Sequence, residues 1–235
     1  MIKPLTIITG STRGIGKQIG LDLIKKGHYV VFTGTNLDAL TSLIKEVGKK
    51  NASVMLCDFT SKEEITSFCD NFKDKKIDNI IFNVGETNRE SFVNLTRCEW
   101  DNVFDTNLNK PVFIIQQLCK QIQKRIIFIG SVSGHVPDAT SIPYGVSKGA
   151  LEILTKYLAK EFASRKITVN TLAPGYTSTN WHVNKSKAQI KRIEKKILLK
   201  RFATVEEISH ACQFLIENDY ITGQTLCVDG GFNYE

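Results

Sequence analysis

The amino-acid sequence predicts one α/β domain over residues 1–235, in which helices cover both faces of a doubly wound parallel sheet of about seven strands. Three observations support this fold class. Short apolar runs alternate with longer helical patterns along the chain, which is typical of parallel strands joined by right-handed crossovers. A glycine-rich turn separates the first of these runs from the first helical pattern. No repeat, low-complexity segment or linker divides the chain, whose length suits one domain with an extensive core.

Strand-like runs and helical patterns alternate along the chain. The expected strands lie near residues 5–9, 29–33, 53–57, 78–82, 125–129, 167–172 and 225–228. The expected helices lie near residues 15–26, 37–48, 61–73, 99–121, 143–163 and 204–217. Ligands of such sheets bind beyond the carboxyl ends of the strands, so the loops that follow the strands are expected to carry the functional residues.

The turn after the first expected strand has the glycine spacing of a phosphate-binding loop. Gly10 permits the tight turn, Gly14 lets the backbone approach a pyrophosphate, and Gly16 lets the helix pack closely on the strand. The free N–H groups at the start of the following helix, and the positive end of its dipole, favour phosphate groups at this position. The order strand, turn, helix predicts a dinucleotide site of the Rossmann type.

Tyr144 and Lys148 are four residues apart in an expected helix and therefore lie on the same face of it. Ser131 precedes the tyrosine by thirteen residues. A phenol has an ordinary pKa of about 10, and a neighbouring ammonium group favours the phenolate and lowers that pKa. An isolated pair at this spacing is usually an ordinary pair on a helix surface. Together with the glycine turn, this pair indicates a proton-transfer site.

Further short segments follow in the order known from one enzyme family. They are Thr9–Gly16, Cys57–Thr60, Asn83–Gly85, Thr106–Asn107, Gly130–Ser131, Tyr144–Lys148, Pro174–Gly175 with Thr179, Ile221–Thr225 and Val228–Gly231. On these segments the chain resembles the short-chain dehydrogenase/reductases, and among them the single-domain branch that contains the 3-oxoacyl-acyl-carrier-protein reductases. The resemblance extends from Leu5 to about Gly231 and so covers nearly the whole chain.

The resemblance implies a role for each of four catalytic residues. Tyr144 would act as general acid or base, and Lys148 would lower its pKa and hold the nicotinamide ribose. Ser131 would hydrogen-bond the substrate oxygen. Ser133 is its rival because both follow the same strand, but the thirteen-residue spacing favours Ser131. Asn107 would hold a water that links Lys148 to solvent, whereas an asparagine in a helix can also satisfy backbone groups alone.

The resemblance also implies which residues hold a nicotinamide dinucleotide. They belong to the glycine turn, to the loops after the second, third, fourth and sixth strands, and to the catalytic pair: Gly10, Ser11, Thr12, Arg13, Gly14, Ile15, Gly16, Thr35, Asp58, Phe59, Asn83, Gly85, Tyr144, Lys148, Pro174, Gly175, Thr177 and Thr179. No metal site is expected, because the sequence has no Cys/His cluster with ligand spacing.

Two positions favour NADP(H) as the cofactor, with NAD(H) as the alternative. Gly34 stands where an NAD-selective relative would place an acidic residue for the ribose 2′-hydroxyl. Arg13 can pair with a 2′-phosphate through its planar guanidinium, the alternative being a solvated loop arginine. The second arginine that is common in the family would fall at Thr35 and is missing.

Two departures from the family leave the substrate open. Phe82 replaces the first residue of the usual Asn-Asn-Ala-Gly segment, while Asn83 and Gly85 are retained. The loop Glu86–Ser91 differs from that of the acyl-carrier reductases, and this loop borders the substrate in the family. A 3-oxoacyl thioester is therefore the first expectation, and a sugar, a sugar nucleotide or another polar ketone is the second.

Positive charge is concentrated in one segment near the C-terminus. Residues 185–201 hold eight basic residues and one acid, Glu194, so this segment accounts for the net charge of +7 of the whole chain. By resemblance, residues 180–201 form a flap over the substrate, where basic side chains would attract an anionic substrate or carrier. Arg165 matches a carrier-docking arginine of the family. The alternative is a solvated helix face; nucleic acid is a poor partner because no recognition motif accompanies the lysines.

These observations predict an NADPH-dependent carbonyl reductase or alcohol dehydrogenase. A non-catalytic NAD(P)-binding regulatory protein is the alternative from another class, which the presence of Ser131, Tyr144 and Lys148 disfavours. The six cysteines without CxxC spacing, and the lack of any long apolar run, predict a cytoplasmic protein without a membrane span. The resemblance implies a homo-oligomer, a tetramer or a dimer.

Overall fold

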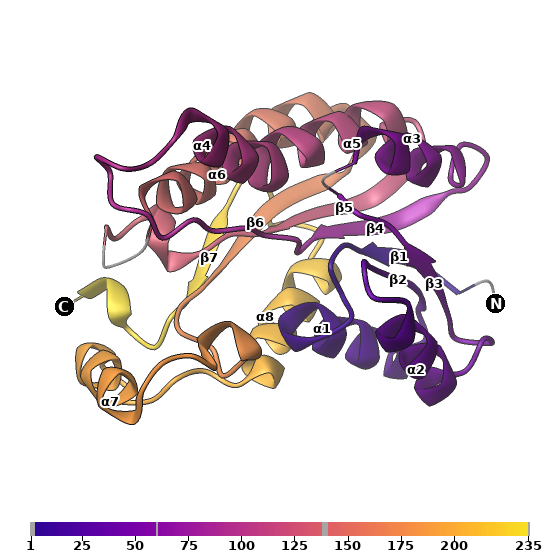
Figure 1. The fold of residues 1–235 in the computed structure, drawn as a ribbon. Coiled ribbons are helices and arrows are strands. Elements are labelled where there is room, and N and C mark those ends of the chain that lie inside the picture. Colours follow the sequence, from indigo (N-terminus) through magenta and orange to yellow (C-terminus); the bar gives the residue numbers. More distant parts are fainter. Residues whose placement is uncertain (1–2, 60, 138–140, 235) are drawn as a thin grey trace.

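A seven-stranded sheet forms the centre of the protein, and helices lie on both of its sides (Figure 1). The computed structural model describes residues 3–59, 61–137 and 141–234. The strands are β1 (Leu5–Ile8), β2 (Tyr29–Gly34), β3 (Ala52–Leu56), β4 (Ile77–Phe82), β5 (Ile122–Ile129), β6 (Thr168–Pro174) and β7 (Thr225–Val228). Their order is β3-β2-β1-β4-β5-β6-β7, and every neighbouring pair is parallel. The predicted doubly wound parallel sheet is confirmed.

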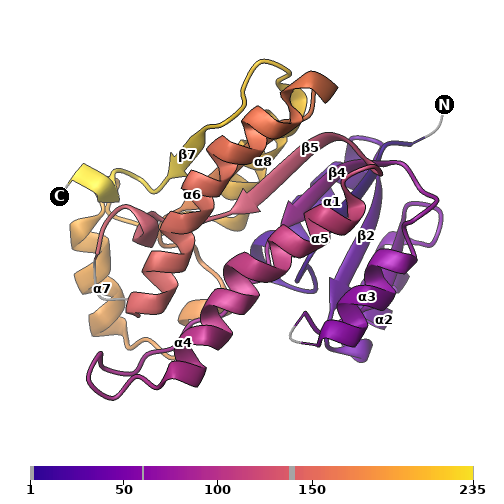
Figure 2. The same ribbon diagram turned by 90° about the horizontal axis from the view of Figure 1, so that it is seen from above.

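The helices form two layers because each buries one apolar face against the sheet. The first layer contains α3 (Lys62–Asp70), α4 (Arg97–Phe104), α5 (Lys110–Leu118) and α6 (Ile142–Phe162). The second contains α1 (Gly14–Lys25), α2 (Leu37–Val47) and α8 (Val205–Glu217). Viewed from above, α5 and α6 cross the strands side by side (Figure 2). Each layer has its own apolar core, with Phe68, Ile115 and Leu151 in the first and Ile19, Leu40 and Ile208 in the second.

The expected helix over residues 99–121 is wrong in two respects. A π-helical turn, Asp105–Asn109, joins α4 to α5, and β5 already begins at Ile122. Pro111 explains the turn: it has no N–H for the carbonyl of Asn107, and its ring clashes with that carbonyl in a regular α-helix. The sequence analysis also placed no helix in the basic segment, where α7 (Lys187–Lys196) begins with a capping box between Ser186 and Gln189.

The carboxyl ends of the parallel strands point toward the same edge of the sheet. The loops after β1, β4, β5 and β6 therefore meet there, although they are far apart in the sequence. The sheet order changes direction at β1 and β4, because the chain runs from β1 outward to β3 and then returns to the other side of β1. This arrangement fixes where a ligand site can form.

Candidate active site

A cavity of about 750 Å³ lies beyond the carboxyl ends of the strands. This volume falls within the range of about 300–1,000 Å³ that is usual for ligand pockets. The structure brings most of the predicted site residues together in its walls: Gly10, Thr12, Arg13, Gly14, Ile15, Thr35, Asp58, Phe59, Asn83, Gly85, Ser131, Tyr144, Lys148, Pro174, Gly175, Thr177 and Thr179. Three predicted residues, Ser11, Gly16 and Asn107, are not among the lining residues.

The glycine turn owes its shape to its own backbone and to Asn83. Gly10 and Gly14 have φ of +59° and +56°, which side chains with a Cβ rarely adopt. A Cβ on Gly16 would lie 2.5 Å from Nδ2 of Asn83. That Nδ2 donates to the carbonyl oxygens of Thr9 (3.1 Å) and Gly10 (2.7 Å). Gly16 therefore makes room for the amide that braces the turn, while its own atoms stay outside the cavity wall.

Ser11 joins β1 to β2 and does not reach the cavity. Its side chain is fully buried, donates to the carbonyl oxygen of Ile8 (2.8 Å) and accepts from the N–H of Thr33 (3.0 Å). Its own N–H donates to the carbonyl oxygen of Thr33 at 2.8 Å. Both polar groups of Ser11 are thus used within the fold, so the structure corrects its expected place at the cofactor to that of a brace.

Lys148 forms the floor of the cavity. Its side chain comes from α6, is only 3% exposed, and donates from Nζ to the carbonyl oxygen of Ile129 at 2.7 Å. Burial lowers the pKa of Lys148 to about 8. A Cβ on Gly85 would lie 3.5 Å from this Nζ, so the backbone of Gly85 leaves the ammonium group open toward the loop after β4.

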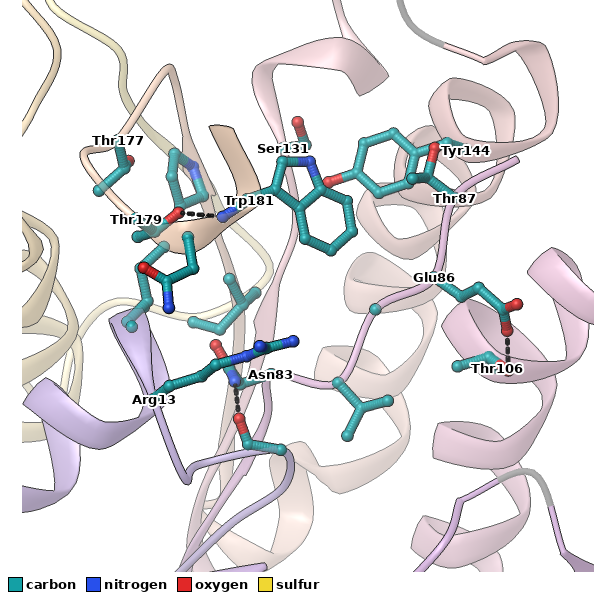
Figure 3. A pocket seen from close by; sticks show the side chains of 18 of the residues that line it. Arg13, Asn83, Glu86, Thr87, Thr106, Ser131, Tyr144, Thr177, Thr179 and Trp181 are labelled. Carbon is teal, nitrogen blue, oxygen red and sulfur yellow. Dashed lines mark hydrogen bonds between the residues drawn. The ribbon is translucent and has the colours of Figure 1, made fainter. Parts of the chain in front are cut away.

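Tyr144 and Ser131 place two hydroxyl groups side by side at the end of β5 (Figure 3). Burial raises the pKa of Tyr144, and a hydrogen bond with Ser131 opposes that rise. Nζ of Lys148 lies 5.7 Å from the centroid of the phenol ring. In this structure desolvation of the phenol outweighs its hydrogen bond with Ser131. The expectation that Lys148 lowers the pKa of Tyr144 stays a prediction.

The structure bears on which of the two serines, Ser131 or Ser133, pairs with Tyr144. Both line the cavity, and Oγ of Ser131 accepts from the N–H of Ser133 at 3.1 Å. This bond fixes the Ser131 hydroxyl at the end of β5, next to the phenol of Tyr144, with which it forms a hydrogen bond. The geometry thus favours Ser131 as the partner of the tyrosine.

Asn107 lies in the π-helical turn behind the cavity wall. Its Oδ1 accepts from the N–H of Glu86 (2.8 Å), and its Nδ2 donates to the carbonyl oxygen of Glu86 (2.9 Å) and to Oγ of Ser147 (2.9 Å). Ser147 in turn donates to the carbonyl oxygen of Tyr144 at 2.8 Å. Asn107 therefore ties the loop after β4 to the helix of the catalytic pair.

The end of the cavity next to the glycine turn and β2 holds the residues on which the choice between NADP(H) and NAD(H) depends. A Cβ on Gly34 would lie 2.5 Å from Cγ2 of Thr12, so an acidic side chain could stand there only if Thr12 moved. Arg13 precedes α1, is exposed, and extends into the cavity (Figure 3). Thr35 is exposed at the end of β2, and Asp58 follows β3.

An aromatic wall between β6 and α7 was not predicted from the sequence. Trp181 and His182 belong to a short 3₁₀ helix that Thr179 caps, and both line the cavity. The rings of Trp181 and Tyr144 are 6.1 Å apart, while His182 contacts the rings of Tyr176 and Phe202, each at 5.4 Å. Burial lowers the pKa of His182 to about 4. The pair Trp181–His182, separated from Thr179 by one residue, was the sequence feature that could have indicated this wall.

The loop after β4 contributes further side chains that the sequence analysis did not assign. Glu86, Thr87 and Arg89 line the cavity, together with Thr106 from the π-helical turn. The sequence of this loop departs from the family, but the backbone path that brings these side chains to the cavity depends on the hydrogen bonds between Asn107 and Glu86.

Comparison with known proteins agrees with this geometry. The family model described as "Enoyl-(Acyl carrier protein) reductase" matches residues 10–233. The 3-oxoacyl-[acyl-carrier-protein] reductase FabG of Buchnera aphidicola subsp. Schizaphis graminum is 36% identical, with 97% of each chain covered. The enzyme of the same name from Rickettsia conorii is also 36% identical, over 96% of this chain and 95% of the relative. The chain belongs to the short-chain dehydrogenase/reductase family.

Solved structures of this family share the fold. A gluconate 5-dehydrogenase from Burkholderia cenocepacia, in complex with NADP and tartrate, is 27% identical with a TM-score of 0.91, over 100% of this chain and 97% of that one. A putative gluconate dehydrogenase from Agrobacterium tumefaciens is 26% identical with a TM-score of 0.92, over 99% and 96%.

The chain is therefore an oxidoreductase that acts on CH–OH or C=O groups with a nicotinamide cofactor. The non-catalytic alternative is set aside. The residues present fit such a cofactor, because the glycine turn presents its backbone to the cavity and the cavity volume leaves room for a dinucleotide along the strand ends.

Two further findings concern other classes of function. Across the described residues, no group of three or more His, Cys, Asp or Glu side chains could hold a metal ion. Among the same residues, none of the helices combines the length and the apolar character needed to cross a bilayer. All six cysteines are free thiols.

Proposed function

We propose that the protein is an NADPH-dependent reductase that converts a 3-oxoacyl thioester into the 3-hydroxyacyl product. The hydrogen-bonded hydroxyl pair of Ser131 and Tyr144 above the buried Lys148 carries this proposal. The relatives named 3-oxoacyl-[acyl-carrier-protein] reductase, at 31–37% identity over nearly the full length, support the choice of substrate.

The chemistry follows from the protonation state of the site. The bound cofactor supplies the hydride to the carbonyl carbon. Ser131 and Tyr144 donate hydrogen bonds to the carbonyl oxygen, where negative charge develops. Because burial raises the pKa of Tyr144, the phenol carries the proton that it must give to that oxygen. Lys148, whose Nζ donates to the carbonyl of Ile129, would contact the nicotinamide ribose and return a proton to the phenol.

The preference for NADP(H) is part of this proposal, with NAD(H) as the weaker cofactor. Arg13 supplies a guanidinium at the end of the cavity where Gly34 stands in place of an acidic residue, and an acidic side chain there would require Thr12 to move. The Burkholderia cenocepacia structure was solved with NADP, which supports the same preference.

We also propose that the basic segment receives an acidic carrier. None of residues 183–201 is among those that line the cavity, but Lys187, Lys191, Arg192 and Lys195 are exposed on α7. Ile193 and Ile197 are buried on the opposite side, against Val132 and Phe232. Arg165 is a weaker candidate for docking, because its guanidinium already donates to the carbonyl oxygens of Cys119 and Ile122.

The carrier proposal is tested by replacing Lys191, Arg192 and Lys195 together by Gln. The KM for a carrier-bound substrate should rise several-fold and lose its dependence on salt, while the KM for a small thioester stays constant. An unchanged KM for the carrier-bound substrate would show that α7 is only a solvated face.

A polar ketone, such as a keto sugar acid, is the second candidate substrate. Glu86, Arg89 and His182 give the cavity wall a polar character, and the solved relative that was crystallised with tartrate is named a gluconate 5-dehydrogenase.

We also propose a homo-oligomer, dimer or tetramer, in which the exposed side chains Phe113, Ile153 and Tyr157 of α5 and α6 are covered. Light scattering of the purified protein tests this: a monomer would contradict it.

The decisive experiment is a substrate panel followed by the oxidation of NADPH. Acetoacetyl thioesters, keto sugar acids and simple ketones are compared by kcat/KM, with Tyr144→Phe as the inactive control. The proposal expects the thioester to exceed the others by at least about tenfold. Faster reduction of a keto sugar acid would replace the first candidate by the second.

A further inference from the structure

Arg89 is a cavity-lining cation that the proposed chemistry does not use. It belongs to the loop after β4 and lines the cavity together with Trp181 and His182. In the same loop, Thr87 lies beside Tyr144 (Figure 3), and its hydroxyl donates to Oγ of Ser141, the residue that caps α6. Arg89, two residues further on, therefore stands at the substrate end of the cavity, away from the glycine turn.

A second positively charged side chain, that of Lys185, lies near the same end of the cavity. Lys185 donates from its backbone N–H to the carbonyl oxygen of His182 at 3.0 Å, so its side chain starts one turn from the aromatic wall. Across residues 3–59, 61–137 and 141–234, no carboxylate forms an ion pair with Arg89 or Lys185. Both charges also help to keep the pKa of His182 low, after burial, which places them near its ring.

The acidic side chains of the cavity do not neutralise this end. Glu86 points away from Trp181, and its Oε2 accepts from the hydroxyl of Thr106 at 3.2 Å (Figure 3). Asp58 follows β3 and lies on the side of the sheet where the glycine turn and Arg13 stand. The imidazole of His182 is neutral near pH 7, since its pKa is about 4. The substrate end thus carries unbalanced positive charge.

We propose that Arg89, supported by Lys185, binds an anionic group of the substrate at a point beyond the reacting carbonyl. The inference rests on the proposed reductase activity and specifies which substrates it prefers. A guanidinium suits this role because its planar fork can donate two hydrogen bonds to one phosphate or carboxylate. The anion is either the phosphate of a phosphopantetheine arm or the carboxylate of a small keto acid.

The kinetic test compares Arg89→Gln with the wild type on three substrates. Acetoacetyl-4′-phosphopantetheine and acetoacetyl-pantetheine differ by one phosphate, and a keto sugar acid carries a carboxylate instead. If the phosphate is bound, Arg89→Gln raises the KM for the phosphorylated thioester about tenfold, without changing kcat or the KM for the other thioester. If the carboxylate is bound, only the KM for the keto acid rises by that factor.

Arg97→Gln is the matched control. It removes the same charge from α4, where Arg97 is 91% exposed in its side chain and pairs with Asp101 at 3.1 Å, outside the set of cavity-lining residues. Equal KM values for Arg89→Gln, Arg97→Gln and wild type on all three substrates would overturn the anion site.

A binding measurement separates this inference from the proposed activity. The chain has two tryptophans, and Trp100 stacks on Phe104 at 4.8 Å in α4, so Trp100→Phe leaves Trp181 as the only fluorophore of this kind. Titration with 4′-phosphopantetheine, which has no carbonyl to reduce at a thioester, should change the Trp181 fluorescence, and Arg89→Gln should weaken that binding about tenfold. For a carboxylate site, tartrate should give this response instead. A protein that reduces no thioester, yet shows either Arg89-dependent response, would retain the anion site and lose the proposed substrate. A protein that reduces the thioester, but whose ligand binding does not depend on Arg89, would retain the proposed substrate and lose the anion site.

Discussion

The two ends of the cavity, one proposed for the cofactor and the other for the substrate, are built in different ways. At the cofactor end, the glycine turn offers backbone N–H groups, and its shape depends on Gly10 and Gly14 with positive φ and on the Asn83 amide that braces it. At the substrate end, the wall consists of side chains such as Arg89, Trp181 and His182. Backbone recognition tolerates few changes, whereas a wall of loop side chains can be exchanged without disturbing the sheet. The family's common chemistry and its varied substrates follow from this difference.

Among the effects on ligand recognition and stability, the largest is expected at Arg13, the side chain proposed to bind the 2′-phosphate of NADPH. Arg13→Gln should lower kcat/KM with NADPH by about 10- to 100-fold and leave kcat/KM with NADH nearly unchanged, since only NADPH carries the 2′-phosphate. Steady-state kinetics with both cofactors measures this. Equal losses with NADPH and NADH would mean that Arg13 shapes the turn and does not read the phosphate.

A smaller effect is expected when the brace of the turn is disturbed. Gly16→Ala should displace Asn83, because the new Cβ would lie 2.5 Å from its Nδ2. The free energy of unfolding should fall by about 1–3 kcal/mol and NADPH binding should weaken. The double variant Gly16→Ala/Asn83→Ala provides the control: its loss should be below the sum of the two single losses, since the clash with the Asn83 amide is absent and only the close approach to the Ser11 backbone remains. Strict additivity would show that the two residues act independently.

The smallest effect concerns stability at the substrate end. The pKa of His182 is about 4 in the folded protein, against 6.5 for an ordinary histidine, so between these values the unfolded chain binds one more proton than the folded one. The free energy of unfolding should therefore fall as the pH is lowered from 6.5 toward 4, and His182 should account for about 1 kcal/mol of this loss at pH 5. His182→Phe, which keeps the ring between Tyr176 and Phe202, should remove that portion. Identical pH dependence in the two proteins would contradict the assignment.

The sequence predicts the cofactor end better than the substrate end, for a physical reason. The glycine turn and the Tyr144–Lys148 pair are local patterns whose spacing determines their geometry. Ser11 lies within such a pattern but is turned into the sheet by Thr33, a contact between two strands that spacing alone does not reveal. The π-helical turn at Asn107 was missed because Pro111 acts four residues away. Trp181, His182 and Arg89 meet only through the fold, since β5 and α6 separate their loops in the sequence.

The pKa shifts of Tyr144 and Lys148 also could not be predicted from the sequence. Helical spacing places Lys148 near Tyr144, but it does not show that the ammonium donates to the carbonyl of Ile129 or that burial dominates the pKa of both groups. The two pKa values shift in opposite directions: that of the phenol rises while that of the lysine falls to about 8. A protonated phenol is the form that a reductase needs.

The central claim is that Tyr144 protonates the substrate oxygen and Ser131 hydrogen-bonds it, while the glycine turn and the neighbouring loops hold most of the cofactor. Measuring kcat and the dissociation constant of NADPH for Tyr144→Phe and Ser131→Ala tests it most directly. We predict that kcat falls about 100- to 10,000-fold in Tyr144→Phe and about 10- to 1,000-fold in Ser131→Ala, with NADPH binding within about threefold of wild type. A kcat of Tyr144→Phe within tenfold of wild type, with NADPH still bound, would contradict the account.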